Sequence, residues 1–296
     1  MSNFHCVKEF NRAFDMVAKE PKDYIGYDED NNGFIKINPY KYCRTKVFES
    51  QSLIRLRLNL IKEEIEELFD AIKVNDMKET RDAIGDILYV VYGMSDILGI
   101  DINYIFQNKI QDEVMKYYLD NSNTSNTKFI DKIISASDNG YKSITNFKYI
   151  KIFFEELSNN EVIKNIIKKI NELYLKLEKE CESDIIYSNF ENKIIIISQY
   201  IYNLLKWTYI LANIYNINAD SDFAIIHESN MSKLCDNEED AKATVDDYNI
   251  KYKAGKSPYD SPYYYELPDL KKWIVKNKSS GKALKNIKYK EVIFSL

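Results

Sequence analysis

The amino-acid sequence predicts an all-α protein, a helical bundle with a small β-hairpin near its C-terminal end. Its 296 residues include only 8 glycines and 5 prolines, which favours helices because these residues interrupt them most often. Apolar residues recur at helical spacing over long stretches, most clearly between residues 52 and 98. A pattern in the first half of the chain recurs in the second half, which predicts a tandem repeat with a pseudo-two-fold axis.

The first half is expected to contain four helices. Phe4–Ala18 has apolar residues along one stripe, and the polar, turn-rich stretch Glu20–Tyr42 predicts a long surface loop. The helices Ser52–Ala71 and Asp76–Leu98 follow, and Ile102–Tyr118 is the fourth. Because the connector between the second and third helices is short, we expect them to pack as antiparallel neighbours.

Acidic residues recur four positions apart on both of these neighbouring helices. Such positions share one helix face, so the pair could direct up to five carboxylates into one groove. Those on the second helix stand among apolar residues, where a role in solubility alone is not expected. Close carboxylates repel one another, and a hard divalent cation relieves that repulsion. The five residues are Glu63, Glu64, Glu67, Asp82 and Asp86.

Motifs on these helices resemble a known family. Glu-Glu-x-x-Glu-Leu (63–68), followed by Asp-Ala-x-x-Asp-Ile-Leu-Tyr-Val-Val-Tyr-Gly (82–93), resembles the all-α nucleoside triphosphate pyrophosphohydrolases of the MazG and phosphoribosyl-ATP pyrophosphohydrolase types. His-Glu-Ser-Asn-Met-Ser-Lys (227–233) and Gly-Lys-Ala-Leu-Lys (281–285) resemble later segments of the phosphoribosyl-ATP branch, in the same order. The resemblance implies a fold built from MazG-like helical units.

The same resemblance implies a reaction. A nucleoside triphosphate is hydrolysed between its α- and β-phosphates to a monophosphate and pyrophosphate, as nucleotide-pool housekeeping. The five carboxylates are expected to hold Mg²⁺, or Mn²⁺ in its place, and to carry the catalysis, with one glutamate as general base. Which glutamate serves, and which nucleobase is preferred, stays open. The residues expected to bind the nucleotide are Asn230, Lys233, Arg55, Lys282 and Lys285, whereas His227 is expected to cap or pack.

The second half is expected to be a degenerate copy of the first. Residues 216–223 align with residues 99–106, and residues 168–173 match residues 63–68. Where the first copy has carboxylates, the second has ammonium and amide groups, between which a divalent cation does not bind; these are Lys168, Lys169, Gln199 and Asn203. We therefore expect one metal site per chain. A fused pair of copies also predicts that Asn230 and Lys233 lie within one triphosphate length of Asp86.

The chain divides into four predicted segments. They are a first repeat with the acidic site (residues 1–119), a linker (120–145), a degenerate second repeat (146–235) and a C-terminal segment (236–296). Within the last segment we expect a helix over Glu238–Tyr252 and a loop over Lys253–Pro268. Trp273–Asn277 and Ala283–Val292 are the expected arms of a β-hairpin.

The composition of the chain argues against several classes of binding partner and cellular location. A net charge of −5 argues against binding to a nucleic-acid polymer, and charged residues interrupt every apolar run, which argues against secretion or a membrane span. Four scattered cysteines and two histidines make a zinc site improbable and favour reduced thiols. We expect a cytoplasmic protein, in the host cytoplasm if the source is viral, that is a monomeric pseudo-dimer or a homodimer.

Two rival functions come from other classes. A catalytically inactive or regulatory nucleotide-binding protein would keep the same fold, and decay of half of the duplicated site favours that alternative. A di-iron helical-bundle oxidoreductase needs Glu-x-x-His pairs, and neither carboxylate helix contains a histidine. The hydrolase is the preferred interpretation.

Overall fold

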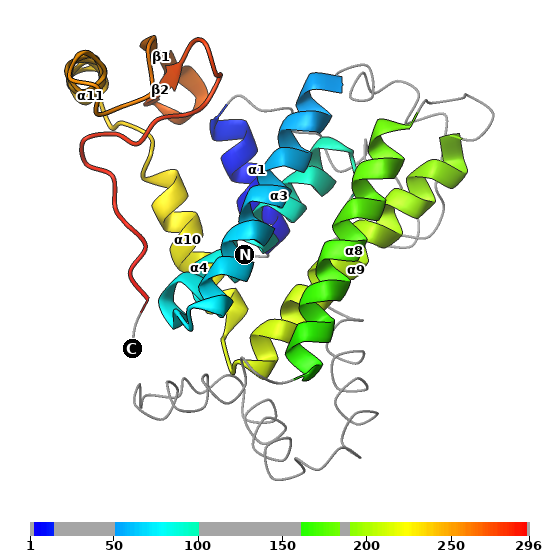
Figure 1. Ribbon diagram of the computed structural model, residues 1–296. Helices are drawn as coiled ribbons and strands as arrows, with labels where there is room; N and C mark the ends of the chain where they lie inside the picture. Colours follow the sequence, from blue (N-terminus) through cyan, green and yellow to red (C-terminus); the bar gives the residue numbers. More distant parts are fainter. Residues whose placement is uncertain (1–2, 15–50, 101–160, 184–189, 295–296) are drawn as a thin grey trace.

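The computed structural model describes residues 3–14, 51–100, 161–183 and 190–294, which are mainly helical (Figure 1). A two-stranded antiparallel sheet and a short 3₁₀ helix follow the last α-helix. The all-α class with a small C-terminal hairpin is therefore confirmed. The elements are α1 (Asn3–Ala13), α3 (Gln51–Lys73), α4 (Met77–Ile97), α8 (Glu161–Glu182), α9 (Phe190–Ile214), α10 (Ala219–Met231), α11 (Glu238–Lys253), β1 (Pro262–Leu267), η4 (Pro268–Leu270) and β2 (Lys272–Asn277).

Helix α4 lies at the centre of the bundle. It packs against α3, α1, α9 and α10, and every residue from Ile87 to Ile97 is buried. This burial follows from a sequence that is apolar on almost every face of the helix. Asp82 and Asp86, one turn apart, stay partly exposed. A central, enclosed helix thus carries two of the candidate site residues.

Both ends of α4 have the capping residues that the sequence predicts. The Asp76 carboxylate accepts a hydrogen bond from the Glu79 backbone N–H at 3.0 Å, which satisfies one of the free donors of the first turn. After the last turn, Gly99 has a φ of 69°, a left-handed conformation that glycine adopts without strain. Only Val74–Asp76 separates α3 from α4, so the two helices run antiparallel, as expected (Figure 1).

Two pairs of helices form the body of the molecule. The α3–α4 pair lies beside the α8–α9 pair, with α3 against α8 and α4 against α9 (Figure 1). Their inward faces form one apolar core. The expected helix at 102–118 and the linker at 120–145 lie outside the described residues, as do the loop at 20–42 and the end of the first predicted helix. The tandem repeat and the four segment boundaries therefore remain predictions.

A buried polar cluster ties α1 to this body. Arg57 of α3 donates a hydrogen bond to Asn11 Oδ1 at 2.9 Å, and Asn11 Nδ2 donates to Asp96 Oδ2 at 2.5 Å. Burial lowers the pKa of Arg57 to about 10, while the Asp96 carboxylate opposes that shift. Gly93 admits the guanidinium, because a Cβ at that position would lie 2.8 Å from Arg57 Nη1. Arg57 therefore holds three helices together.

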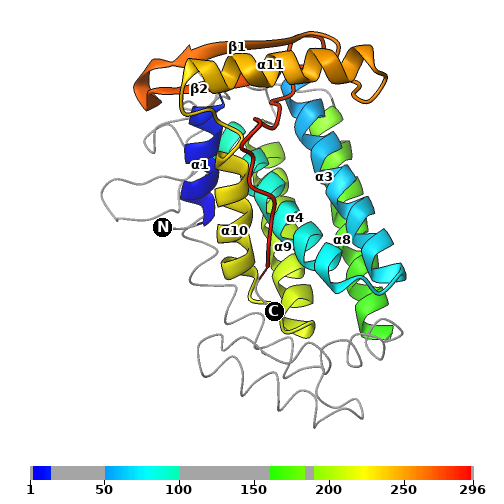
Figure 2. The same ribbon diagram turned by 90° about the vertical axis from the view of Figure 1, so that its left-hand side faces the viewer.

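The C-terminal hairpin is real, but its arms were misassigned. The first arm is Pro262–Leu267, which the sequence placed in a loop, and it pairs with Lys272–Asn277. Three consecutive tyrosines suit a strand that packs on both faces, and Lys271, with φ 50°, completes the turn. The predicted second arm makes a single bridge, at Ala283, and then continues as an irregular tail. Figure 2 shows α11 and the hairpin across one end of the bundle, and the tail beside α10.

None of the helices in the described part of the chain is long and apolar enough to cross a membrane.

Candidate active site

The α3–α4 pair brings acidic side chains from both helices together. Glu63 and Glu67 are exposed on α3, and Glu64 is partly buried between them. The charges of Glu63 and Glu67, together with those of Asp82 and Asp86 on α4, repel the Glu64 carboxylate. The five carboxyl groups therefore interact electrostatically across the two antiparallel helices, and their assignment to one site remains a prediction.

Two of these carboxyl groups titrate far above their usual range. Burial, followed by repulsion from Asp86 and the neighbouring glutamates, raises the pKa of Glu64 to about 8. Burial and repulsion from Asp82 raise the pKa of Asp86 to about 7, although nearby lysines oppose the shift. Like charges held close in a partly desolvated groove have this effect. Such perturbed acids in one place are typical of a functional site.

Asp82 has an unsatisfied oxygen. Its Oδ1 is buried and accepts no hydrogen bond within the part of the chain that the structure describes. Burial and the Glu79 carboxylate raise the pKa of Asp82. An unpartnered buried acceptor costs about 1–3 kcal/mol, which makes Asp82 Oδ1 a candidate for contact with a ligand.

Lys233, far from these acids in the sequence, lies beside them in the structure. It follows the last turn of α10, donates a hydrogen bond to Asn230 Oδ1 at 2.5 Å and stands 5.9 Å from the ring centre of Phe10. Burial lowers the pKa of Lys233, while the Asp86 and Glu64 carboxylates counteract this. The electrostatic interaction between Lys233 and Asp86 agrees with the expectation that these two residues lie near each other, and Asn230 is linked to them through Lys233.

Helix α10 reaches this position because it packs closely on α4. A Cβ at Gly85 would lie 2.1 Å from Ile226 Cδ1, so the Ile226 side chain in its present position packs where any larger residue would displace it. One turn earlier, Arg81 donates two hydrogen bonds to the buried Asp222 carboxylate, at 2.7 and 2.6 Å. A bidentate pair of this kind fixes orientation as well as distance. The two contacts set the register of α10 along α4.

The C-terminal tail brings two more lysines to the same place. The positive charge of Lys285 opposes the rise in the pKa values of Asp82 and Asp86. Lys282 and Lys285 both depress the pKa of Lys233. The ammonium group of Lys285 also stands 4.3 Å from the ring centre of Tyr289. Acidic and basic side chains from three distant parts of the sequence therefore share one electrostatic field.

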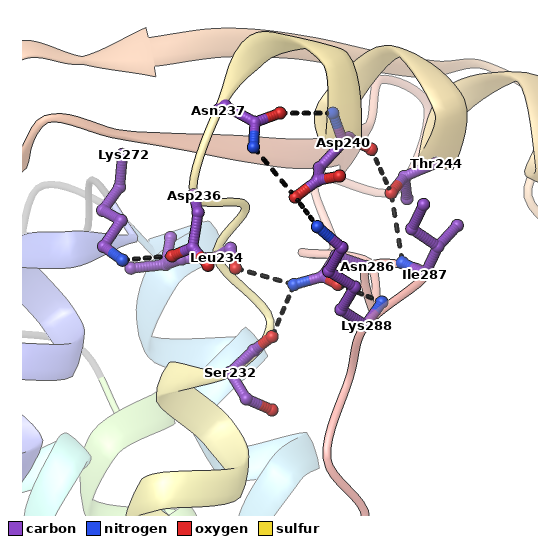
Figure 3. Close-up of polar contacts among 10 residues, drawn as sticks. All are labelled: Ser232, Leu234, Asp236, Asn237, Asp240, Thr244, Lys272, Asn286, Ile287 and Lys288. Atoms are coloured by element: carbon purple, nitrogen blue, oxygen red, sulfur yellow. Dashed lines mark hydrogen bonds and ion pairs between the residues drawn. The ribbon is translucent and has the colours of Figure 1, made fainter.

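Hydrogen bonds attach this tail to α10 and α11. Figure 3 shows the Asn286 amide between the carbonyl groups of Ser232 and Leu234, and the Ile287 N–H on Thr244. Lys288 pairs with Asp240 at 2.6 Å. Further along, Phe294 stacks over Arg81, at 4.5 Å from ring centre to guanidinium carbon. The tail is thus attached to the end of α10, to α11 and to α4 at positions that follow Lys285.

Comparison with known proteins places the chain in a family. A family model described as phosphoribosyl-ATP pyrophosphohydrolase matches residues 39–112, which include α3, α4 and all five carboxylates. Uncharacterized protein L479 of Acanthamoeba polyphaga mimivirus is 31% identical over 295 residues, covering 99% of this chain and 94% of the relative. Residues 39–112 therefore match a phosphoribosyl-ATP pyrophosphohydrolase domain of the MazG-like superfamily, and the whole chain belongs to one family with the uncharacterized mimivirus protein.

The domain match over residues 39–112 supports a pyrophosphohydrolase-type activity in general. The mimivirus relative extends the similarity over α10 and the C-terminal tail, which the family model does not reach. No solved structure matches the chain.

Proteins of the MazG-like superfamily generally depend on divalent metals, so the fit of these residues to a cation can be tested. No three acidic, histidine or cysteine side chains in the described ranges converge closely enough to hold a metal by themselves. The donors are nevertheless all carboxylate oxygens, one of them without a hydrogen-bond partner among the described residues, and burial followed by mutual repulsion raises the pKa values of Glu64 and Asp86. Mg²⁺ needs only one or two carboxylates, with phosphate oxygens and water completing its shell. The donor set therefore fits a hard cation that arrives with a phosphate ligand.

Two other candidate residues lie apart from the acids. Arg55 is exposed and forms an ion pair with Glu182 of α8 at 3.9 Å, so the structure does not bring it into the cluster. His227 accepts or donates a hydrogen bond at 3.1 Å to the Tyr89 hydroxyl and lies 3.6 Å from Glu9 of α1. Burial lowers the pKa of His227. Its packing between helices agrees with the expectation that it caps or packs.

Sequence reasoning missed the residues that shape the site without carrying its charge. Gly85, Arg81 and Asp222 set the approach of α10, and Asn286 holds the tail. An arginine directly before Asp82 and an aspartate in the first turn of α10 were visible in the sequence, but nothing there paired them. Asn286 follows Lys285 in an irregular segment, where no periodicity marks a buried residue.

Proposed function

We propose that this protein hydrolyses nucleoside triphosphates to monophosphates and pyrophosphate, with Mg²⁺. The observation that supports this is the meeting of two kinds of charge in one groove: carboxylates on α3 and α4, and lysines from the end of α10 and from the tail. Carboxylates alone suit a cation, and lysines alone suit an anion. A magnesium–triphosphate complex needs both.

The proposal gives each group a role. Glu63, Glu64, Glu67, Asp82 and Asp86 would hold Mg²⁺, with Mn²⁺ as a substitute. When bound, the cation would supply positive charge to the phosphate groups and make a nearby water molecule more acidic. One of the three glutamates takes the proton of the attacking water.

Lysines on the other side of the groove would bind the triphosphate. Lys233, Lys282 and Lys285 offset the charge of the phosphate oxygens and of the departing pyrophosphate, each as a point charge. The Asn230 carboxamide has both a donor and an acceptor for base, sugar or phosphate, and its oxygen already accepts a hydrogen bond from Lys233.

Product analysis tests the reaction. The purified chain is incubated with Mg²⁺ and each of a panel of ribo- and deoxyribonucleoside triphosphates, and the products are separated by anion-exchange chromatography. We expect monophosphate and pyrophosphate in equal amounts from at least one substrate, and none in the presence of EDTA. Diphosphate with orthophosphate would refute the bond assignment. Binding without any turnover would instead indicate an inactive nucleotide-binding protein.

A further inference from the structure

Asn286 occupies an unusual position between two of the proposed phosphate-binding lysines. Its side chain is buried, with 7% of the residue exposed. The amide donates hydrogen bonds at 2.6 Å to the carbonyl oxygens of Ser232 and Leu234, the two residues that flank Lys233 (Figure 3). Its own oxygen accepts from the Lys288 N–H. The carboxamide therefore joins the turn that carries Lys233 to the strip of tail that carries Lys285.

These bonds act against a repulsion. The charges of Lys282 and Lys285 are close enough to Lys233 to depress its pKa, so the tail and the turn repel each other electrostatically when no anion is bound. Leu284, with 2% exposed, packs into the small core beneath α11 and holds the other neighbour of Lys285. The Lys285 backbone is thus fixed on one side by apolar packing and on the other by Asn286.

We propose that Asn286 is a positioning residue that fixes the spacing of Lys233 and Lys285 for a polyphosphate. This inference rests on the proposed function and deepens it. A carboxamide suits the task because it has two donors for the two carbonyl groups and carries no charge. An aspartate of the same shape would direct acceptors at those carbonyl groups, and buried acceptors without donors are costly.

A matched pair of variants separates positioning from simple attachment of the tail. Asn286→Asp loses both bonds to the Lys233 turn. Thr244→Val loses the bond to the Ile287 N–H, at 3.2 Å, which attaches the same tail to α11 without touching that turn. Thermal unfolding establishes that each variant is folded, and Asn286→Ala replaces Asn286→Asp if the charged variant does not fold.

The measurements are the affinity for a non-hydrolysable triphosphate analogue with Mg²⁺, by calorimetry, and the kinetic constants for the substrate. We expect Asn286→Asp to weaken analogue binding and to raise KM by about tenfold, with kcat changed much less, because misplaced ammonium groups lose charge-assisted bonds to phosphate. Thr244→Val should leave both constants near those of the wild type. In a Lys233→Ala/Lys285→Ala background, Asn286→Asp should add less than about twofold, because coupled residues are not additive.

Four outcomes would overturn the inference. Equal effects of the two variants would show that Asn286 only attaches the tail. A tenfold effect that persists in the lysine-free background would show that it acts elsewhere. A wild-type chain that binds no triphosphate would refute the proposed function and this inference together, whereas wild-type binding with an unaffected Asn286→Asp variant would refute the inference alone.

Discussion

The two helix pairs of the body differ in how their polar residues are satisfied. At the positions aligned with Glu63 and Glu67, the α8–α9 pair has the exposed Lys168 and the partly buried Glu172, which form an ion pair at 4.0 Å. Asn203, aligned with Asp86, donates at 2.7 Å to the carbonyl group of Gln199 on its own helix. The α3–α4 pair instead has carboxyl groups whose pKa values are raised by burial and by mutual repulsion. Ion pairs and hydrogen bonds within one helix are typical of a structural role, whereas repelling carboxyl groups are typical of a functional site.

The largest expected effect is on the turnover rate, when a carboxylate of the α3–α4 pair is replaced. Asp86→Asn or Glu67→Gln should lower kcat by about two orders of magnitude or more, because each removes a carboxylate that would hold the cation. Glu66→Gln is the matched control, since Glu66 is exposed and paired with Lys62 at 3.7 Å on another face of α3. Asn203→Ala tests the second pair and should leave turnover unchanged. Near-normal turnover rates in both carboxylate variants would show that the active site lies elsewhere in the protein.

A smaller effect is expected on the lysine side of the groove. Lys233→Ala should raise KM or lower kcat by about tenfold, the usual cost of one charge-assisted bond to phosphate. Binding of Mg²⁺ alone, followed by calorimetry, should not weaken, because the lysine repels the cation. Lys168→Ala, at an exposed position of the second pair, provides the comparison. A Lys233 variant with unchanged kinetic constants would argue against the composite site.

The number of nucleotide-binding sites per chain distinguishes one functional helix pair from two. If only the α3–α4 pair holds a cation and nucleotide, calorimetry with the triphosphate analogue should give about one site per chain. A value near two would place a second site in the α8–α9 pair and would contradict the aligned positions given above.

The smallest effect concerns stability without divalent cations. Because the pKa values of Glu64 and Asp86 are raised to about 8 and about 7, the folded chain binds more protons than the unfolded chain above about pH 4, up to those values. This contribution to stability is present at low pH and is lost as the pH rises through 7 and 8. In EDTA, Asp86→Asn should therefore gain a few degrees in unfolding temperature relative to the wild type between about pH 5 and about pH 8. A pH-independent difference would contradict the raised pKa.

Much of the site could be predicted because periodic signals place it. Four-residue spacing put the carboxylates on facing helix surfaces, and the capping residues Asp76 and Gly99 fixed the ends of α4 to within a residue or two. Treating the two halves as fused partners predicted that Lys233 lies near Asp86, and the electrostatic interaction between the two residues agrees with this. The composite site and the repeat both remain predictions.

What the sequence did not reveal depends on contacts between irregular or distant segments. The strand Pro262–Leu267 was hidden by its flanking prolines, and its pairing with Lys272–Asn277 is decided by packing against α11 and the bundle. Arg55 was assigned to the groove from its type, but its direction on α3 is toward α8. Asn286 is buried because it bonds to two carbonyl groups at the end of α10. No local sequence pattern predicts that contact.

The wide spacing of the charged segments along the chain has a consequence for synthesis. The acidic helices leave the ribosome first, and the lysines of α10 and the tail follow only near the end. At about 5–20 residues per second, that interval is on the order of tens of seconds. During it the nascent protein carries its carboxylates without their cationic counterparts, so it is unable to assemble a complete site. Activity would therefore begin only once translation has passed Lys285, and a messenger RNA truncated upstream of that codon would yield an inactive protein.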